Sequence, residues 1–268
     1  MQNTLIKLKR TKNIRDLGGI VTKDGKRVKS GKIIRSGRLS KLPPETVAAL
    51  ESLNIDNVVD LRSKREMAEN PPTLLKGAVY HYLYLIPTAY PELTNSKHMS
   101  TEMYAQSKRV KKDFGTYENY MHAMYRYVVS DGESRKKLKT VFDLFLAEEN
   151  CILFHCNSGT DRTGIITMLL LSVLGVEKEE ILKDYMLSHK LQRRRRYTQK
   201  FGLIVSPISL RFKRLLYAQM LPKPQYILTL MEEIERDFGS VKNYVVRALG
   251  VTEEQIELLK NKYLEDEA

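Results

Sequence analysis

Three apolar runs of strand length stand out along the chain. They lie at 57–63, 77–85 and 151–156, and the last, "CILFHC", is apolar at almost every position. A near-continuous run of branched and aromatic residues is typical of a strand that is buried on both faces of a sheet. We expect these three segments to be core strands.

Helical patterns alternate with these runs. Pro43 and Pro44 predict a helix that extends to about Ser52, because proline is favoured in the first helical turn. A very apolar helix is expected to begin at about Thr163. The remaining helical patterns lie near 117–130 and 134–148, over 178–190, and through most of the C-terminal third. Strands that alternate with helices predict an α/β fold with a mainly parallel central sheet flanked by helices.

Three segments depart from this pattern. Residues 24–37 alternate apolar and basic positions around glycines, which favours a short hairpin. Residues 88–113 are polar and irregular, whereas residues 191–222 carry four consecutive arginines and a "LPKP" turn, so we expect a helical cap or lid there. No linker divides the chain, and we therefore expect a single domain over residues 1–268.

The net charge of +13 is concentrated in two regions. Residues 1–50 carry 13 Lys or Arg against 3 acids, and residues 190–223 carry 10 against none. Such asymmetry suits nucleic acid, an anionic membrane surface or a small polyanionic substrate, and a solvated basic surface explains it equally well. Only two cysteines occur, and no run resembles a signal peptide or a bilayer span, which favours a cytoplasmic protein.

The last strand is followed by "NSGTDR" and then by the apolar helix. A loop between a buried strand and a helix N-terminus can direct several backbone amides at one anion, and the helix end adds positive potential. Gly159 permits backbone angles that other residues resist. The thiolate form of Cys156 is favoured in such a loop, so Cys156 is the candidate nucleophile.

Arg162 and Thr163 extend this chemistry. The guanidinium is a planar fork that fits two phosphoryl oxygens, and the threonine hydroxyl is placed to stabilise the sulfur as a leaving group. The reaction is then phosphoryl transfer through a cysteinyl-phosphate, which requires no metal or cofactor. No group of Cys, His or carboxylates has metal-site spacing. The residues expected to bind the phosphoryl group are Asn157, Ser158, Gly159, Thr160, Asp161 and Arg162.

These motifs resemble those of the bacterial members of the tyrosine phosphatase superfamily that also attack phosphoinositides, whose signature is close to H-C-x-x-G-K-D-R-T-G. Similar blocks lie at 13–42, 58–63, 174–188 and 238–265. The resemblance implies a cysteine-phosphatase fold of the dual-specificity type. One departure is that Thr160 stands where the family has a lysine, which lowers the expected preference for multiply phosphorylated lipids.

A leaving oxygen needs a proton, so a carboxyl group is expected near the loop. Asp161 lies inside the loop, as an aspartate does in the phosphoinositide phosphatases that the sequence resembles. Asp60 ends an apolar run and is the second candidate, although a structural pair with Arg62 or Arg65 explains it nearly as well. We favour Asp161 as the acid.

Other polar residues are expected to be structural. His155 directly precedes the nucleophile and should donate to nearby backbone, while Cys151 should belong to the core. The residues expected to brace the loop, on the basis of their match to the family's N-terminal block, are Asn13, Arg15, Asp16, Arg35 and Ser36.

The sequence therefore predicts a metal-independent phosphomonoesterase that acts on phosphotyrosine, with phosphoserine, phosphothreonine and phosphoinositides as further substrates. One alternative is a phosphoinositide-preferring lipid phosphatase, and another is a non-catalytic basic protein that binds nucleic acid or anionic lipid. Rhodanese-like sulfurtransferases and arsenate reductases also carry a cysteine in an anion loop, but the aspartate and the Thr-Gly pair fit them less well. We expect an enzyme with peripheral contact to anionic membranes and no nucleic-acid partner.

Overall fold

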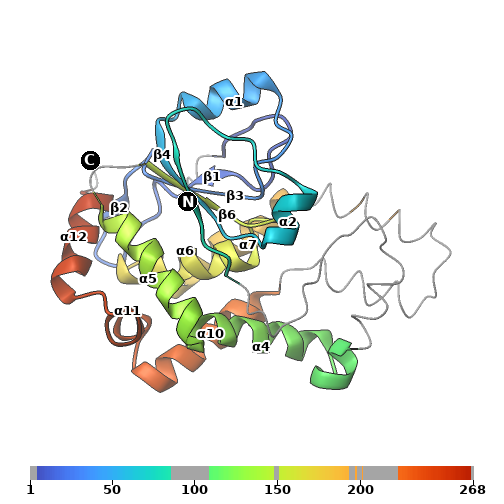
Figure 1. Cartoon of the computed structure of the whole chain (residues 1–268). Helices are drawn as coiled ribbons and strands as arrows, with labels where there is room; N and C mark the ends of the chain where they lie inside the picture. Colours follow the sequence, from blue (N-terminus) through green and yellow to red (C-terminus); the bar gives the residue numbers. More distant parts are fainter. Residues whose placement is uncertain are drawn as a thin grey trace.

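The computed structural model describes residues 5–85, 109–147, 151–192 and 223–266, together with Tyr197 and Phe201 (Figure 1). Most of the polar segment at 88–113 and of the expected cap at 191–222 lies outside these residues. None of the helices described is both long enough and apolar enough to span a membrane.

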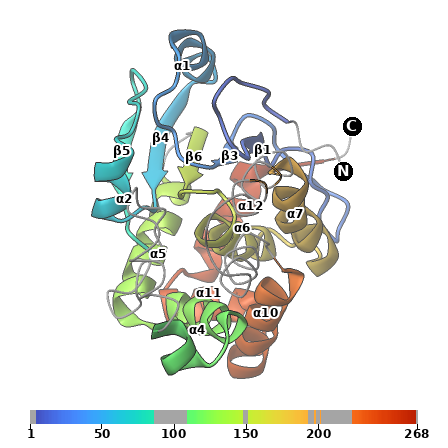
Figure 2. The ribbon, with the colours of Figure 1, turned by 90° about the vertical axis from the view of Figure 1, so that its right-hand side faces the viewer.

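A five-stranded sheet forms the centre of the described structure, in the order β1-β3-β6-β4-β5. The strands β3, β6, β4 and β5 are parallel, and β1 is antiparallel at one edge. Figure 2 shows the five strands side by side in this order. The strands are β1 (Arg15–Asp16), β3 (Ile33–Ser36), β4 (Ile55–Asp60), β5 (Val79–Tyr82) and β6 (Cys151–His155). The predicted mainly parallel sheet is confirmed.

Helices cover both faces of this sheet. In β6, Ile152 and Phe154 point into the larger core, which the helices α4, α5, α6, α10, α11 and α12 complete, while Leu153 joins the smaller core with Leu50 of α1. Figures 1 and 2 show α1 on one side of the sheet and the other helices of this group on the opposite side. The helices are α1 (Pro44–Glu51), α2 (Lys64–Glu69), α4 (Tyr117–Ser130), α5 (Gly132–Leu146), α6 (Asp161–Val173), α7 (Lys178–Leu191), α10 (Pro224–Phe238), α11 (Val241–Leu249) and α12 (Glu253–Tyr263).

The helix α6 is buried along nearly its whole length, as its apolar sequence predicts. It begins at Asp161, two residues before the expected start, so that Asp161 and Arg162 both lie in its first turn. A Cβ atom on Gly164 would lie 3.0 Å from the ring of Tyr185 on α7. Glycine at this position therefore lets α7 pack against the helix end that carries the candidate site.

The predicted hairpin at 24–37 is wrong. Its first strand, β2 (Arg27–Val28), pairs with β7 (Leu264–Glu265), whereas β3 pairs with β1 and β6. Both edges of β3 are thus occupied within the central sheet, which leaves no edge for β2. The alternation in this segment reflects two separate sheets rather than two strands of one hairpin.

The carboxyl ends of three parallel strands meet at one edge of the sheet. Ser36 of β3 and Asp60 of β4 both stand opposite His155, the last residue of β6. Open α/β sheets bind ligands beyond this edge, where loops leave the strands. Cys156 directly follows β6 and so lies at the position where a ligand site is expected.

Candidate active site

Residues 156–160 join β6 to α6 and curl around the cysteine sulfur. Cys156 is only 1% exposed, and the backbone N–H of Gly159 donates a hydrogen bond to its Sγ at 3.2 Å. Gly159 has a φ of +72°, and a Cβ atom there would lie 2.4 Å from the carbonyl oxygen of Ser36. Only glycine allows the loop to lie this close to β3.

Three successive loop carbonyls are each held from outside the loop. The carbonyl of Asn157 accepts from the backbone N–H of Arg38 at 3.3 Å. The carbonyl of Ser158 accepts from Asn13 Nδ2 at 3.3 Å and from Gln192 Nε2 at 3.2 Å. The carbonyl of Gly159 accepts from Asn13 Nδ2 at 2.8 Å and from Arg35 Nη2 at 2.9 Å. The C=O and N–H of a planar trans peptide point in opposite directions, so the N–H groups of residues 158–160 turn away from these donors. The Gly159 bond to sulfur has this direction. The loop thus forms a concavity of amide donors, which suits an anion.

A buried ion cluster supports the loop from beneath. Asp184 of α7 accepts from Arg15 Nε at 2.8 Å and from Arg35 Nη1, and all three side chains are at most 1% exposed. Burial opposes ionisation of Asp184, but the two guanidinium groups outweigh it and keep the pKa of this carboxyl below its usual value. Burial and the charge of Arg15 lower the pKa of Arg35 to about 10 despite Asp184. Arg35 links this cluster to the loop, because its Nη1 donates to Asp184 and its Nη2 donates to the Gly159 carbonyl.

The expected braces differ in what they contact. Asn13 and Arg35 bind loop carbonyls directly, and Arg15 holds the Asn13 side chain at 2.6 Å. The backbone of Ser36 packs against Gly159. Asp16 instead accepts from the backbone N–H groups of residues 18 and 31, away from the loop.

Arg162 is held by a carboxylate that sequence reasoning missed. Glu66 of α2 accepts from Arg162 Nη1 and Nη2, both at 2.7 Å, and Leu61 O accepts from Nη1 at 3.0 Å. Glu66 also closes a capping box with Ser63 at the start of α2. Burial opposes its ionisation, but Arg162 dominates and keeps the pKa of Glu66 below its usual value. The S-x-x-E pattern at 63–66 was the available sequence signal.

Asp161 lies among phenol groups. Tyr125 Oη donates to Asp161 Oδ1 at 2.8 Å and lies 2.9 Å from Tyr185 Oη. Burial raises the pKa of Asp161, although the Tyr125 hydrogen bond and the charge of Arg162 oppose the shift. A carboxyl group whose pKa is raised by burial retains a proton for transfer at higher pH.

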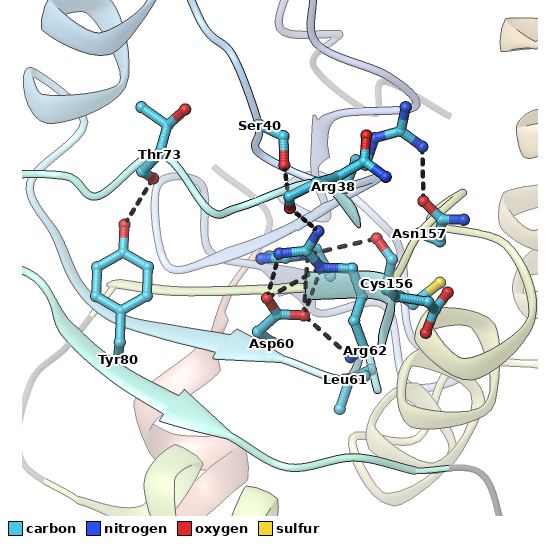
Figure 3. A network of polar contacts seen from close by, with 12 residues as sticks. Arg38, Ser40, Asp60, Leu61, Arg62, Thr73, Tyr80, Cys156 and Asn157 are labelled. Carbon is cyan, nitrogen blue, oxygen red and sulfur yellow. Dashed lines mark hydrogen bonds and ion pairs between the residues drawn. The ribbon is translucent and has the colours of Figure 1, made fainter. Parts of the chain in front are cut away.

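Asp60 is enclosed by Arg62. Its oxygens accept from Arg62 Nε at 2.9 and 3.0 Å, from Nη2 at 2.7 Å and from the Arg62 backbone N–H at 3.0 Å (Figure 3). Asp60 is 0% exposed. Burial opposes its ionisation, but the adjacent His155 and the bonds and charge of Arg62 keep its pKa below the usual value. Arg65, the other partner considered, pairs with Glu69 instead.

The remaining predicted residues lie on or beside the loop. Thr160 Oγ1 accepts from Gln192 Nε2 at 2.8 Å, and Arg38 Nη1 donates to Asn157 Oδ1 at 2.7 Å. Thr163 Oγ1 is buried and has no hydrogen-bond partner within the described residues.

The first and last residues of β6, Cys151 and His155, are buried. His155 Nδ1 lies 3.4 Å from Cys156 O, and burial lowers the pKa of this imidazole. Cys151 begins the strand and is unpaired, and burial raises the pKa of its thiol to about 12. Its position agrees with the expected core role.

The site defines a class of protein. A buried cysteine follows a central parallel strand, the backbone N–H of Gly159 donates to its sulfur, and an arginine lies in the first turn of the next helix. This arrangement is that of the cysteine-dependent phosphatases. In the parts of the chain that the structure describes, no group of three or more His, Cys, Asp or Glu side chains could hold a metal ion.

Sequence comparisons identify the family. A model of the tyrosine phosphatase family matches residues 6–265, and the chain therefore belongs to this family of hydrolases. A Cupriavidus necator protein whose name assigns it to the tyrosine-protein phosphatases is 31% identical over 258 residues, which cover 91% of this chain and 84% of the relative. The triple specificity protein phosphatase PtpB of Mycobacterium tuberculosis is 27% identical over 274 residues, or 94% and 96% of the two chains. The α/β fold expected from the resemblance is confirmed.

Proposed function

We propose that this phosphatase hydrolyses phosphotyrosine in proteins or peptides through a covalent intermediate on Cys156. The observation that carries the proposal is the hydrogen bond from the Gly159 N–H to Cys156 Sγ, in a loop whose three carbonyls are bound from outside. Amide dipoles and the N-terminus of α6 favour a bound phosphoryl group beside the sulfur.

The first step is attack of Cys156 Sγ on phosphorus. An S–P bond forms, the bond between phosphorus and the ester oxygen breaks, and that oxygen takes a proton from Asp161. In the second step, water attacks the phosphorus, Asp161 accepts a proton from the water, and the S–P bond breaks to release phosphate. The thiolate and the protonated carboxyl are then restored.

Arg162 is proposed to hold the phosphoryl oxygens in both steps. Glu66 and Leu61 engage Nη1 and one hydrogen of Nη2, which leaves the Nε–H and the second Nη2–H for two phosphoryl oxygens. Thr163 is proposed to donate to the departing sulfur in the second step, since its hydroxyl is buried without a partner among the described residues. Asn157, Ser158, Gly159 and Thr160 complete the phosphoryl site.

Phosphotyrosine is proposed as the main substrate class, with phosphoserine, phosphothreonine and phosphoinositides as further classes. The triple specificity of the PtpB relative and the positive charge of Arg38 beside the loop support a wider range. The net charge of +13 supports peripheral contact with anionic membranes.

The test replaces the nucleophile. Cys156→Ser should reduce turnover of a phosphotyrosyl peptide below about one part in a hundred and leave vanadate binding largely intact. Cys151→Ser is the matched control, because it changes the other buried cysteine of the chain, at the opposite end of β6 from Cys156, and it should retain turnover. The panel should include phosphoseryl peptides and phosphoinositides, with a chelator present. Substantial turnover by Cys156→Ser would exclude the covalent mechanism.

A further inference from the structure

Two buried tyrosines connect the sheet-covering helices to Asp161. Tyr125 of α4 and Tyr185 of α7 are each 1% exposed, and their hydroxyl oxygens lie 2.9 Å apart. Tyr125 also reaches Asp161 Oδ1 at 2.8 Å. Tyr125 thus contacts the residue proposed as the acid directly, and Tyr185 contacts it through the Tyr125 hydroxyl.

The direction of these hydrogen bonds follows from the donors present. An ionised Asp161 has no proton to give, so Tyr125 donates to Oδ1. The Tyr125 oxygen is then free to accept from Tyr185, which makes a chain Tyr185 to Tyr125 to Asp161. Burial raises the pKa of both phenols well above the usual value, so both remain donors throughout the working pH range.

Charged and titratable groups from α4, α6, α10 and β3 also act on Asp161. Arg162 on α6 and Arg35 on β3 favour its charged form. Tyr117 on α4 and Tyr226 on α10 are the further titratable groups that sense its charge, and both phenols have raised pKa values because of burial. Of the described side chains, Tyr125 is the one that the structure shows hydrogen-bonded to the Asp161 carboxyl.

We propose that Tyr125, supported by Tyr185, is a positioning residue that holds Asp161 with Oδ1 as an acceptor and places the transferable proton on Oδ2. This inference rests on the proposed role of Asp161 as the acid. An Oδ1 occupied by a donor cannot carry the acid proton without losing that bond, so Oδ2 is the oxygen presented to the leaving group.

The same bond affects the protonation of Asp161. A donor to the carboxylate favours the charged form, and its removal disfavours that form. Tyr125→Phe should therefore raise the pKa of Asp161, and the basic limb of the pH profile of kcat/KM should move to higher pH. A shift of about one pH unit is expected for a hydrogen bond to a charged group. The plateau rate should fall about tenfold, because the carboxyl is no longer held.

The experiment compares three single-hydroxyl deletions. With phenyl phosphate as substrate, Tyr125→Phe should move the basic limb of the kcat/KM profile by the whole expected shift. Tyr185→Phe should move the same limb in the same direction by a smaller amount. Tyr244→Phe is the matched control: Tyr244 is also buried and donates to Val129 O of α4 at 2.7 Å, but it does not touch Asp161. The control should lower the melting temperature without moving the limb.

Asp161→Asn separates the two claims. If it abolishes the basic limb while Tyr125→Phe leaves the limb of the folded enzyme unmoved, the role of Tyr125 is overturned and Asp161 remains the acid. If Asp161→Asn leaves the limb intact, the proposed acid is wrong and the positioning role falls with it. A limb that moves equally in Tyr125→Phe and Tyr244→Phe would also overturn the positioning role, because a general loosening would explain it.

Discussion

Asp60 at the end of β4 and Asp161 at the start of α6 both place a carboxyl group at the loop end of the sheet. The two carboxyl groups differ in the charge of their hydrogen-bond donors and in the direction of their pKa shifts. Asp60 accepts three hydrogen bonds from the guanidinium of Arg62 and one from its backbone N–H, whereas Asp161 accepts from a neutral phenol. The pKa of Asp60 is lowered in spite of burial, and the pKa of Asp161 is raised because of burial. Burial acts to raise the pKa of both carboxyls, but the net shift is downward for Asp60 and upward for Asp161.

The difference teaches that the charge of the donor decides whether a buried carboxyl can act as an acid. A cation compensates for the loss of water and holds the carboxylate ionised, so that no proton is available at neutral pH. A neutral donor compensates only in part, and the protonated form persists. Asp60 is therefore suited to structure, and Asp161 to proton transfer.

The largest expected effect is that of Asp161→Asn on catalysis. Loss of a general acid should lower kcat/KM for phenyl phosphate by about 10² to 10³-fold and remove the basic limb of the pH profile. The fold should remain, since the amide oxygen can still accept from Tyr125. A fall of less than about threefold in steady-state rate would contradict the assignment, because general acids typically contribute far more.

Asp60→Asn should act chiefly on stability. It leaves the buried Arg62 without its counter-charge, which costs about 3 kcal/mol of unfolding free energy and lowers the melting temperature by several degrees. Because the folded-state pKa of Asp60 is lowered, its stabilisation is present above the unfolded pKa and is lost as pH falls through the folded pKa. The gap between native protein and variant should thus be full at neutral pH and close in acid.

The contribution of Asp161 to the free energy of unfolding should change with pH in the opposite direction. Its folded-state pKa is raised, so the folded protein loses stability as pH rises from the unfolded to the folded pKa. Asp161→Asn removes this cost and should be at least as stable as native protein at neutral pH. Thermal melts of both variants across pH measure the contrast, and parallel curves for the two would refute it.

A smaller effect is expected when the surroundings of Asp161 are made more like those of Asp60. Thr160→Lys places a cation beside Asp161 and should lower its pKa, moving the basic limb to lower pH by a few tenths of a unit. It should also raise turnover of a bisphosphorylated inositol lipid relative to a phosphotyrosyl peptide, more at low salt. Thr160→Gln, which also disturbs the Gln192 contact but adds no charge, is the control. An unchanged substrate ratio would show that position 160 does not set specificity.

The fold was largely predictable because strands that are buried on both faces of a sheet have near-continuous apolar sequences. The apolar runs at β4 and β6, the prolines that open α1 and the apolar sequence of α6 were sufficient to identify the central elements. The strands β1, β2 and β7 have two residues each, too few to show a period, and the pairing of β2 with β7 joins opposite ends of the chain.

The loop was predictable as a contiguous motif, and the family resemblance indicated its braces Asn13, Arg15 and Arg35. The other supporting side chains, Asp184, Tyr125 and Gln192, were not predictable. Asp184 lies within an ordinary amphipathic helix, and only tertiary packing brings it between Arg15 and Arg35. Tyr125 lies on α4 and Gln192 directly follows α7, and neither carries a local sequence signature. The sequence favoured Asp161 over Asp60 as the acid but left both as candidates, because each lies at the end of a regular element near the loop. Their partners, which separate them, are a property of the fold.

The most direct test of the assignment is the dependence of kcat/KM on the leaving group, because kcat/KM reports the first chemical step. A series of aryl phosphates whose phenols differ in pKa should be turned over at similar rates by native protein, since Asp161 protonates the departing oxygen. Asp161→Asn should show a steep fall as the pKa of the phenol rises, while Asp60→Asn should keep the shallow dependence of native protein. A steep dependence in Asp60→Asn together with a shallow one in Asp161→Asn would contradict the account and assign the acid to Asp60.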